Sequence, residues 1–221
     1  MRRHLPFLAI LLAFTLSGSA QNWSVGVHSG PFVFGDFVER RVRPASGGSP
    51  AGTVTMTLSA ATRAGLAVDL ERSFAERWAL RLEGTFTRAP LSVEEDGGEG
   101  VALDAGEVDV STFMLPLVFR INPRGSFRVH LMGGPAYAMY RIRGTPNVSG
   151  ITPIDKTTGE FGLAAGGGVA WWWSDRFAVE GNISDVVTGS PFDRDDFPDS
   201  PGWSIPRPHN VHTTVGLRYR F

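Results

Sequence analysis

The chain has 221 residues and no cysteine, so it forms no disulfide and carries no lipoprotein anchor. Its 21 basic and 22 acidic residues leave a formal net charge of −1. This balance gives no reason to expect a nucleic-acid partner. The length is that of one large domain preceded by a short N-terminal segment.

The N-terminal segment is typical of a secretory signal peptide. Arg2-Arg3 supplies positive charge, residues 5–16 are almost all apolar, and residues 18–20 are small. The apolar run is too short to cross about 30 Å of hydrocarbon as a helix, which argues against a transmembrane anchor. We therefore predict a signal peptide over residues 1–20 and one domain over residues 21–221.

Beyond residue 20, apolar and polar residues alternate with a period of two. In residues 78–87, the large apolar side chains occupy even positions, and arginine, glutamate and threonine occupy odd positions. Successive side chains of a strand point to opposite faces, so this pattern predicts strands with one apolar face. Pro116 cannot donate to a ladder and predicts an irregular position. Similar alternation occurs in residues 63–70, 112–120, 127–139 and 211–221.

Short turns alternate with longer loops along the chain. This alternation predicts eight strands with both chain ends on the short-turn side. An even strand number with short turns on one side and longer loops on the other is typical of outer-membrane barrels. A strand pair hidden within residues 29–52 would raise the count to ten. The predicted turns are residues 75–77, 122–125 and 174–176, and the predicted loops are residues 43–52, 94–106, 144–159 and 189–208.

The period alone is equally compatible with a soluble barrel of the lipocalin type, in which the apolar face points inward. Three features favour an outward apolar face. The polar face is rich in glycine and alanine, which suit the crowded lumen of an eight-stranded barrel. Lys156 is the only lysine in the chain, whereas soluble surfaces rely on lysine and glutamate. Aromatic residues also cluster near the short turns, as in an interfacial girdle. The predicted girdle consists of Trp23, Trp78, Phe127, Trp171, Trp173, Phe177, Tyr219 and Phe221.

The last residues of the chain carry a further signal. Val215, Leu217, Tyr219 and Phe221 form an apolar and aromatic face that ends at a terminal phenylalanine. We interpret this face as the insertion signal that a membrane-spanning barrel presents to the barrel-assembly machinery.

With these features the chain resembles the small outer-membrane barrels of the OmpA/OmpX/OmpW type, the broad "outer membrane protein β-barrel domain" group. Residues 127–135 are similar to that group's fifth strand, residues 160–168 to its sixth, and residues 216–221 to its closing signal. The resemblance implies an all-β, eight-stranded antiparallel up-and-down transmembrane β-barrel in a bacterial outer membrane, with short periplasmic turns and longer extracellular loops. Members of the group do many things, so the resemblance supplies no function.

The predicted lumen face collects charged side chains. They are expected to pair, because a buried unpaired charge is very costly. A fully paired network would plug the interior, whereas an arginine-lined path would form a small channel that favours anions. The predicted lumen set is Arg63, Asp69, Arg81, Glu83, Arg120, Arg128, His130, Glu160, Glu180, His212, Arg218 and Arg220.

A catalytic site would need a base and a nucleophile near the membrane rim. The sequence lacks the compact His–Ser pattern of lipid A deacylase barrels, and eight strands are too few for an omptin-like protease. A single strand histidine more often belongs to a hydrogen-bonded lumen, so we predict no catalytic residue. The candidate bases are His130, His209 and His212, and the candidate nucleophiles are Ser126, Ser184 and Thr213.

The fourth predicted loop contains Asp193, Asp195, Asp196 and Asp199. Closely spaced carboxylates are ligands for hard divalent cations. Because no EF-hand spacing accompanies them, we favour a solvated acidic loop. We therefore predict no metal and no cofactor.

These features together predict a non-enzymatic envelope role, either structural or through surface interactions of the extracellular loops. The alternatives are a small channel with an arginine-lined lumen and a lipid-modifying enzyme. The expected partners are outer-membrane lipid and lipopolysaccharide, together with the assembly machinery during biogenesis. We expect a monomer that binds no nucleic acid.

Overall fold

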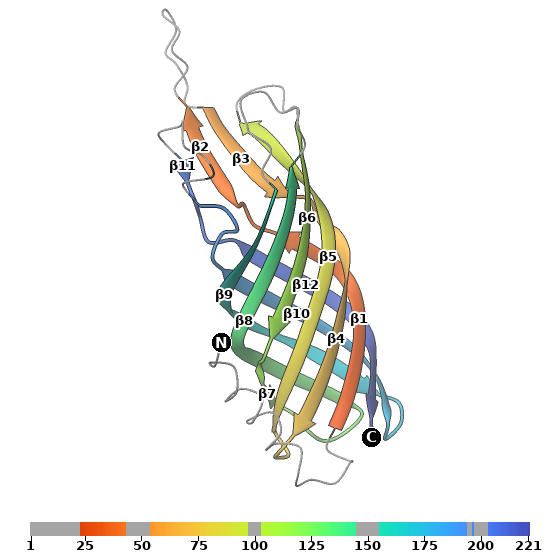
Figure 1. Cartoon of the computed structure of the whole chain (residues 1–221). Helices are drawn as coiled ribbons and strands as arrows, with labels where there is room; N and C mark the ends of the chain where they lie inside the picture. Colours follow the sequence, from red (N-terminus) through yellow and green to blue (C-terminus); the bar gives the residue numbers. More distant parts are fainter. Residues whose placement is uncertain (1–22, 43–53, 97–102, 145–154, 194–195, 197–202) are drawn as a thin grey trace, which may run out of the picture.

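The computed structural model describes residues 23–42, 54–96, 103–144, 155–193, 196 and 203–221, most of which lie in β-strands (Figure 1). The predicted signal peptide lies outside these residues. No helix in the described part of the chain is long and apolar enough to cross a membrane. The strands are β1 (Trp23–Phe34), β2 (Val38–Val42), β3 (Val54–Ala60), β4 (Arg63–Ser73), β5 (Trp78–Asp96), β6 (Leu103–Met114), β7 (Leu117–Arg120), β8 (Phe127–Gly144), β9 (Lys156–Trp172), β10 (Phe177–Thr188), β11 (Trp203–Ser204) and β12 (His209–Arg220).

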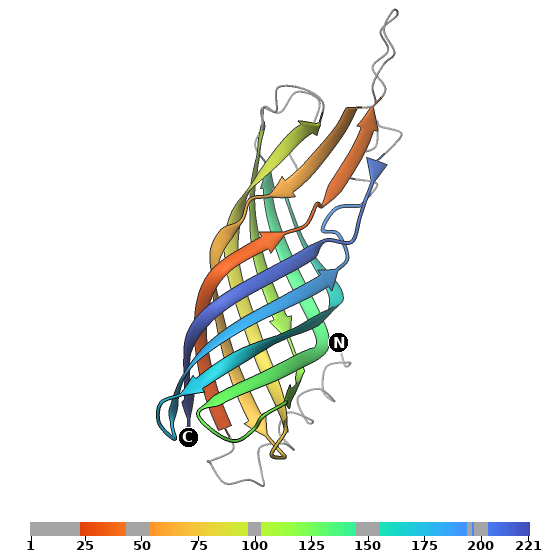
Figure 2. The same ribbon diagram turned by 180° about the vertical axis from the view of Figure 1, so that it is seen from behind.

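The long strands close into an eight-stranded antiparallel barrel, as predicted. β1 pairs with β4 on one side and with β12 on the other, which closes the ring. β6 and β7 together form one spanning strand between β5 and β8. The strands wrap around the barrel at a tilt to its long axis (Figure 2). A closed barrel leaves no unpaired edge, so its backbone is satisfied without water.

Pro116 separates β6 from β7, so the sequence-based expectation of an irregular position there is confirmed. The ladder breaks because proline has no N–H to donate. Backbone groups around the break still find partners. The Pro116 carbonyl accepts a hydrogen bond from the Arg81 N–H at 3.0 Å, and the Leu115 N–H donates to the Pro135 carbonyl at 3.0 Å.

Three short strands extend the barrel beyond its loop end. β2 pairs with β3, β3 with the far end of β5, and β11 with β2. The first predicted long loop, residues 43–52, lies outside the described residues. The strands on either side of it, β2 and β3, lie above the ring and leave its count at eight (Figure 1). The second predicted loop, residues 94–106, is shorter than expected because β5 runs to Asp96 and β6 begins at Leu103.

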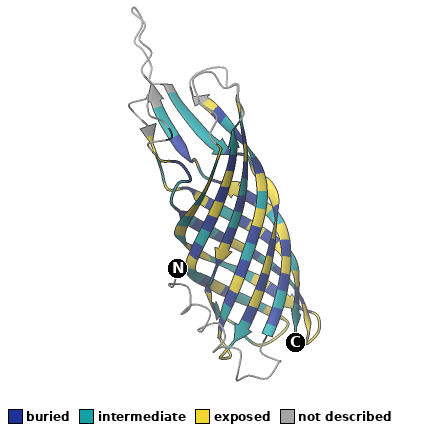
Figure 3. Ribbon diagram, viewed as in Figure 1, coloured by how far each residue is buried: buried dark blue, intermediate teal, exposed yellow. Residues whose placement is uncertain are grey.

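The apolar face of the barrel points outward. Leu217 is 60% exposed and Ile183 is 56% exposed, whereas their neighbours Arg218 and Ser184 are buried. Exposed and buried residues alternate along the strands (Figure 3). This pattern excludes the lipocalin-type alternative, in which large apolar side chains would fill the interior and polar side chains would cover the outside. The exterior therefore suits hydrocarbon.

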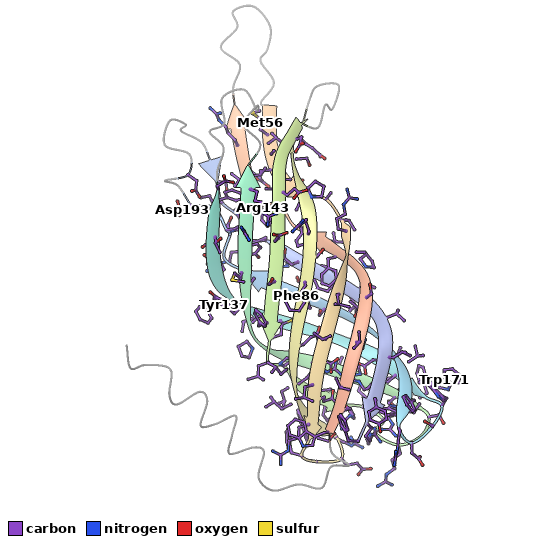
Figure 4. All side chains as sticks on the ribbon, turned by 45° about the vertical axis from the view of Figure 1, so that its right-hand side comes forward. Met56, Phe86, Tyr137, Arg143, Trp171 and Asp193 are labelled. Atoms are coloured by element: carbon purple, nitrogen blue, oxygen red, sulfur yellow. The ribbon has the colours of Figure 1, made fainter. Side chains whose placement is uncertain are left out.

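Most of the predicted girdle residues lie on the outer surface at the end of the barrel that carries the short turns, here called the periplasmic end. Trp171 marks this end in Figure 4, and Arg143 and Asp193 mark the opposite, extracellular end. The rings of Trp173 and Phe177 stack at 6.0 Å, and Tyr219 lies 5.0 Å from Phe177. Trp78, Phe127, Trp171, Trp173, Phe177 and Phe221 are exposed, and Trp23 and Tyr219 are half-buried.

Close approach of β12 to β1 makes Gly216 sensitive to substitution. A Cβ at Gly216 would overlap backbone atoms of Val27 and His28, whereas the nearest atoms to a Cβ at Gly181 lie 3.9 Å away. We expect Gly216→Ala to lower the free energy of unfolding by about 1–3 kcal/mol and Gly181→Ala to change it little. Urea titration of the refolded protein measures both. Equal midpoints for the two variants would contradict the close approach.

Candidate functional site

An ion-pair network in the part of the lumen nearer the periplasmic end is built around Arg218 of β12. Its guanidinium binds both oxygens of Asp69 at 2.8 and 3.0 Å, and it also pairs with Glu180. A third nitrogen donates to the Ser24 hydroxyl at 3.0 Å. Arg218 is only 2% exposed, so these contacts replace water. This is the charge-assisted, multidentate geometry that stabilises a buried arginine.

Arg81 of β5 extends the network toward β4 and β10. It donates to Glu71 at 2.7 and 2.9 Å and lies 2.9 Å from Glu180. Arg120 of β7 binds the other oxygen of Glu71 and donates to the Ser73 hydroxyl at 2.8 Å. Three arginines and the carboxylates of several strands thus share one enclosed cluster, and Glu71 joins Arg81 to Arg120.

Two histidines and an asparagine complete the network. His28 Nε2 lies 2.9 Å from Asp69, and His130 Nε2 lies 3.0 Å from the Asn182 carbonyl oxygen. The Asn182 amide in turn donates to Glu180 at 3.0 Å. His130 is thus held by a hydrogen bond in the lumen. A histidine in this arrangement has a structural role, which is the alternative to a catalytic role for it.

Sequence reasoning missed His28 and Glu71. Both residues are buried. Glu71 follows Asp69 by two residues along β4, and His28 lies on the neighbouring strand β1. The period of two, continued by one step along β4 and applied to residues 23–34, would have found them.

Glycines leave the space that the network fills. A Cβ at Gly26 would meet the side chains of Asp69 and His28, and a Cβ at Gly168 would meet those of Asn182 and His130. The small residues on the inward face thus match the crowded lumen that the sequence predicts, because eight strands enclose little free volume.

Toward the extracellular end the lumen is apolar. Phe32 and Phe34 of β1 pack with Phe37, Tyr140 and Phe192 in one buried cluster. The Tyr140 hydroxyl is satisfied by Thr188 at 2.8 Å and by Asn210 at 3.0 Å. The sequence analysis did not predict this cluster, although its strand residues Phe32, Phe34 and Tyr140 lie on the inward face, as the charged lumen residues do. Phe37 and Phe192 lie in the segments between strands. The interior is therefore filled at two levels, one ionic and one apolar.

The structure places the predicted lumen residues at different depths. One compact set meets in the network, and the others lie toward the two barrel ends. Arg63, at the start of β4, is exposed, and Glu160 is half-buried. His212 is buried against Phe32, with ring centroids 4.2 Å apart. Arg128 and Arg220 are half-buried near the periplasmic end. The predicted lumen residues that belong to the network are Asp69, Arg81, Glu83, Arg120, His130, Glu180 and Arg218.

The extracellular end carries its own ion pairs. Asp109 binds Arg88 at 2.5 Å and Arg143 at 2.7 Å. Lys156 pairs with Asp196 and lies 3.7 Å from Asp193. Asp195 and Asp199 lie outside the described residues. Within those that are described, no three acidic or histidine side chains converge as a metal site would require.

His209, the remaining candidate base, lies outside the lumen. Its Nδ1 atom lies 2.7 Å from Asp185 on the neighbouring strand β10, and both side chains are substantially exposed. The candidate nucleophile Ser184 points the other way, into the lumen, where it is buried. These two candidates therefore do not form a catalytic pair.

No family model and no curated protein matches the chain. Solved structures share its fold. The outer membrane protein OprG from Pseudomonas aeruginosa aligns with a TM-score of 0.62 at 13% identity, over 93% of this chain and 98% of that one. Neisserial surface protein A (NspA) aligns with a TM-score of 0.53 at 8% identity, over 93% and 100%. A major outer membrane protein from Thermus thermophilus aligns with a TM-score of 0.51 at 16% identity, over 90% and 98%. Identities this low indicate a common fold and not a common activity.

Proposed function

We propose that this chain, which has the fold of the small bacterial outer-membrane β-barrels, is a non-conducting envelope protein. It would stabilise the outer membrane or present its extracellular end to other molecules. The observation that carries this proposal is the burial of Arg81 and Arg218, which are 1% and 2% exposed within the lumen network. A path through the barrel would have to pass these two side chains.

The energy of the network favours a closed lumen. Arg218 would have to leave Asp69 and Glu180 to open a path beside it. Breaking one buried ion pair costs about 3–5 kcal/mol, so an open lumen would be a minor state. The apolar cluster around Phe37 and Tyr140 adds a second obstruction.

The extracellular end supports a role in surface contacts. β2, β3 and β11 rise above the ring, so this end projects beyond the eight spanning strands (Figure 1). Loops and rims held by a rigid barrel are frequent binding sites. The outward apolar band would contact outer-membrane lipid and lipopolysaccharide. We further propose that the protein is a monomer and that its C-terminal strand engages the assembly machinery.

Planar-bilayer recording tests the non-conducting proposal. We expect the refolded protein to give no discrete conductance steps under conditions in which a porin, inserted in the same way, does so. Steady steps that change size on Arg81→Gln substitution would contradict the proposal and favour the arginine-lined channel. A gel shift on heating confirms beforehand that the barrel has folded.

A further inference from the structure

A pocket of about 360 Å³ opens at the periplasmic end of the barrel. Three arginines from three different strands line it, namely Arg120, Arg128 and Arg220, and the Ser73 hydroxyl and Glu76 also contribute. Arg120 belongs to the lumen network as well, so the pocket lies directly beside that network. The envelope role proposed above makes no use of it.

Two of these arginines have no acidic partner among the residues that the structure describes. Arg120 binds Glu71, but no carboxylate in the described part of the chain forms an ion pair with Arg128 or Arg220. Arg128 Nε donates to the Gly125 carbonyl at 3.1 Å. Glu76, the acidic residue of the lining, is already engaged by Arg124 at 2.6 Å. The pocket therefore carries uncompensated positive charge.

The unpaired arginines are held in place by a buried aromatic ring. Trp172 is 7% exposed, and its ring lies 3.9 Å from the Arg220 guanidinium carbon and 4.9 Å from that of Arg128. Such cation–π contacts orient the guanidinium groups. Both guanidinium groups lie over the same ring, so two positive charges are close together and repel each other. An anion bound between them would offset this repulsion.

The donors of Arg128 and Arg220 remain available. Buried polar atoms without a partner occur elsewhere in the described chain, but none of them belongs to these two residues. Their spare N–H groups therefore face water rather than protein. Guanidinium groups present a planar fork that matches the oxygens of phosphate and carboxylate groups.

We propose that this pocket binds an oxyanion of the phosphate or carboxylate class from the periplasmic side. Arg128 and Arg220 provide the principal contacts over the Trp172 ring, and Arg120 with the Ser73 hydroxyl completes the lining. The anion adds the missing negative charge to the pocket. This binding requires no passage through the barrel, so it is independent of whether the lumen conducts.

Calorimetric titration of the refolded, full-length barrel in a maltoside detergent tests the site. The probes are inorganic phosphate, pyrophosphate and succinate at constant ionic strength, which separate the two oxyanion classes. We expect binding of at least one probe. Arg128→Gln and Arg220→Gln are each expected to weaken it by roughly tenfold or more, since each removes a charge-assisted hydrogen bond.

Arg176→Gln is the matched control. It removes the same charge from an exposed turn at the same end of the barrel, outside the pocket lining. We expect it to leave the affinity nearly unchanged. The proposal is overturned if no probe binds the wild type up to about 10 mM, or if Arg176→Gln weakens binding as much as Arg128→Gln. Heat-shifted gel mobility identifies the variants that have folded. If Arg220→Gln does not fold, Arg128→Gln alone tests the contribution of the pocket arginines to binding.

Discussion

Arg218→Met is expected to lower the free energy of unfolding by roughly 3–5 kcal/mol, because it leaves buried carboxylates without their main counter-charge. Asp69 accepts two hydrogen bonds from this guanidinium, and Glu180 also pairs with it. Both carboxylates are almost inaccessible to water. Urea titration of folding in lipid vesicles, followed by tryptophan fluorescence, measures the loss.

Arg220→Met is the matched control for Arg218→Met. Arg220 lies two residues further along β12 and faces the same interior, but it contacts the Trp172 ring at 3.9 Å rather than a carboxylate. We expect a loss of about 1 kcal/mol from the cation–π contact. Equal losses for the two variants would show that the ion pairs contribute little. In a double-mutant cycle, Glu180→Gln is expected to cost less in the Arg218→Met background than in the wild type.

Ile183→Arg is expected to lower the free energy of unfolding in a bilayer by about 2–4 kcal/mol, the usual cost of a lipid-facing arginine near the midplane. Ile183 lies in the middle of β10, opposite Thr213 and Gly167, and it is 56% exposed. No lumen or headgroup lies within easy reach of an arginine placed there. Folding yield in vesicles, read from heat-shifted gel mobility and urea midpoints, reports the effect.

Two controls accompany Ile183→Arg. Ile183→Ala separates the loss of side-chain volume from the introduction of charge. Ser126→Arg introduces the same charge in an exposed periplasmic turn, where we expect a change within about 0.5 kcal/mol. If Ile183→Arg folds as well as Ser126→Arg, the outward face does not contact hydrocarbon, and the assignment of faces is wrong.

The faces of the strands were predictable because side-chain direction in a strand follows position with a period of two. Leu217 and Arg218 are adjacent in sequence, and one lies in the outer band while the other is buried in the lumen. The strand ends were less predictable. Composition suggested a loop over residues 94–106, yet β5 continues to Asp96 because β3 offers it a pairing partner beyond the ring.

The level at which lumen residues meet was not predictable from the pattern. Asp69 and Arg218 are 149 positions apart, and their contact depends on the stagger of β4, β1 and β12. The apolar cluster around Phe37 also depends on the stagger between strands. Its members come from β1, β2, β3, β5, β6 and β8 and from connecting segments, and alternation assigns them only to the inward face.

The amino-acid sequence by itself determined the class of fold, the spanning strands and the face of each strand that meets lipid, since these depend on local periodicity and turn chemistry. Only the tertiary structure decided which inward residues touch. Closing a barrel imposes a stagger between neighbouring strands, and that stagger sets the depth of every inward side chain. It is why Arg218 meets Asp69 and Glu180, whereas Arg220 meets Trp172 and has no carboxylate partner in the described part of the chain.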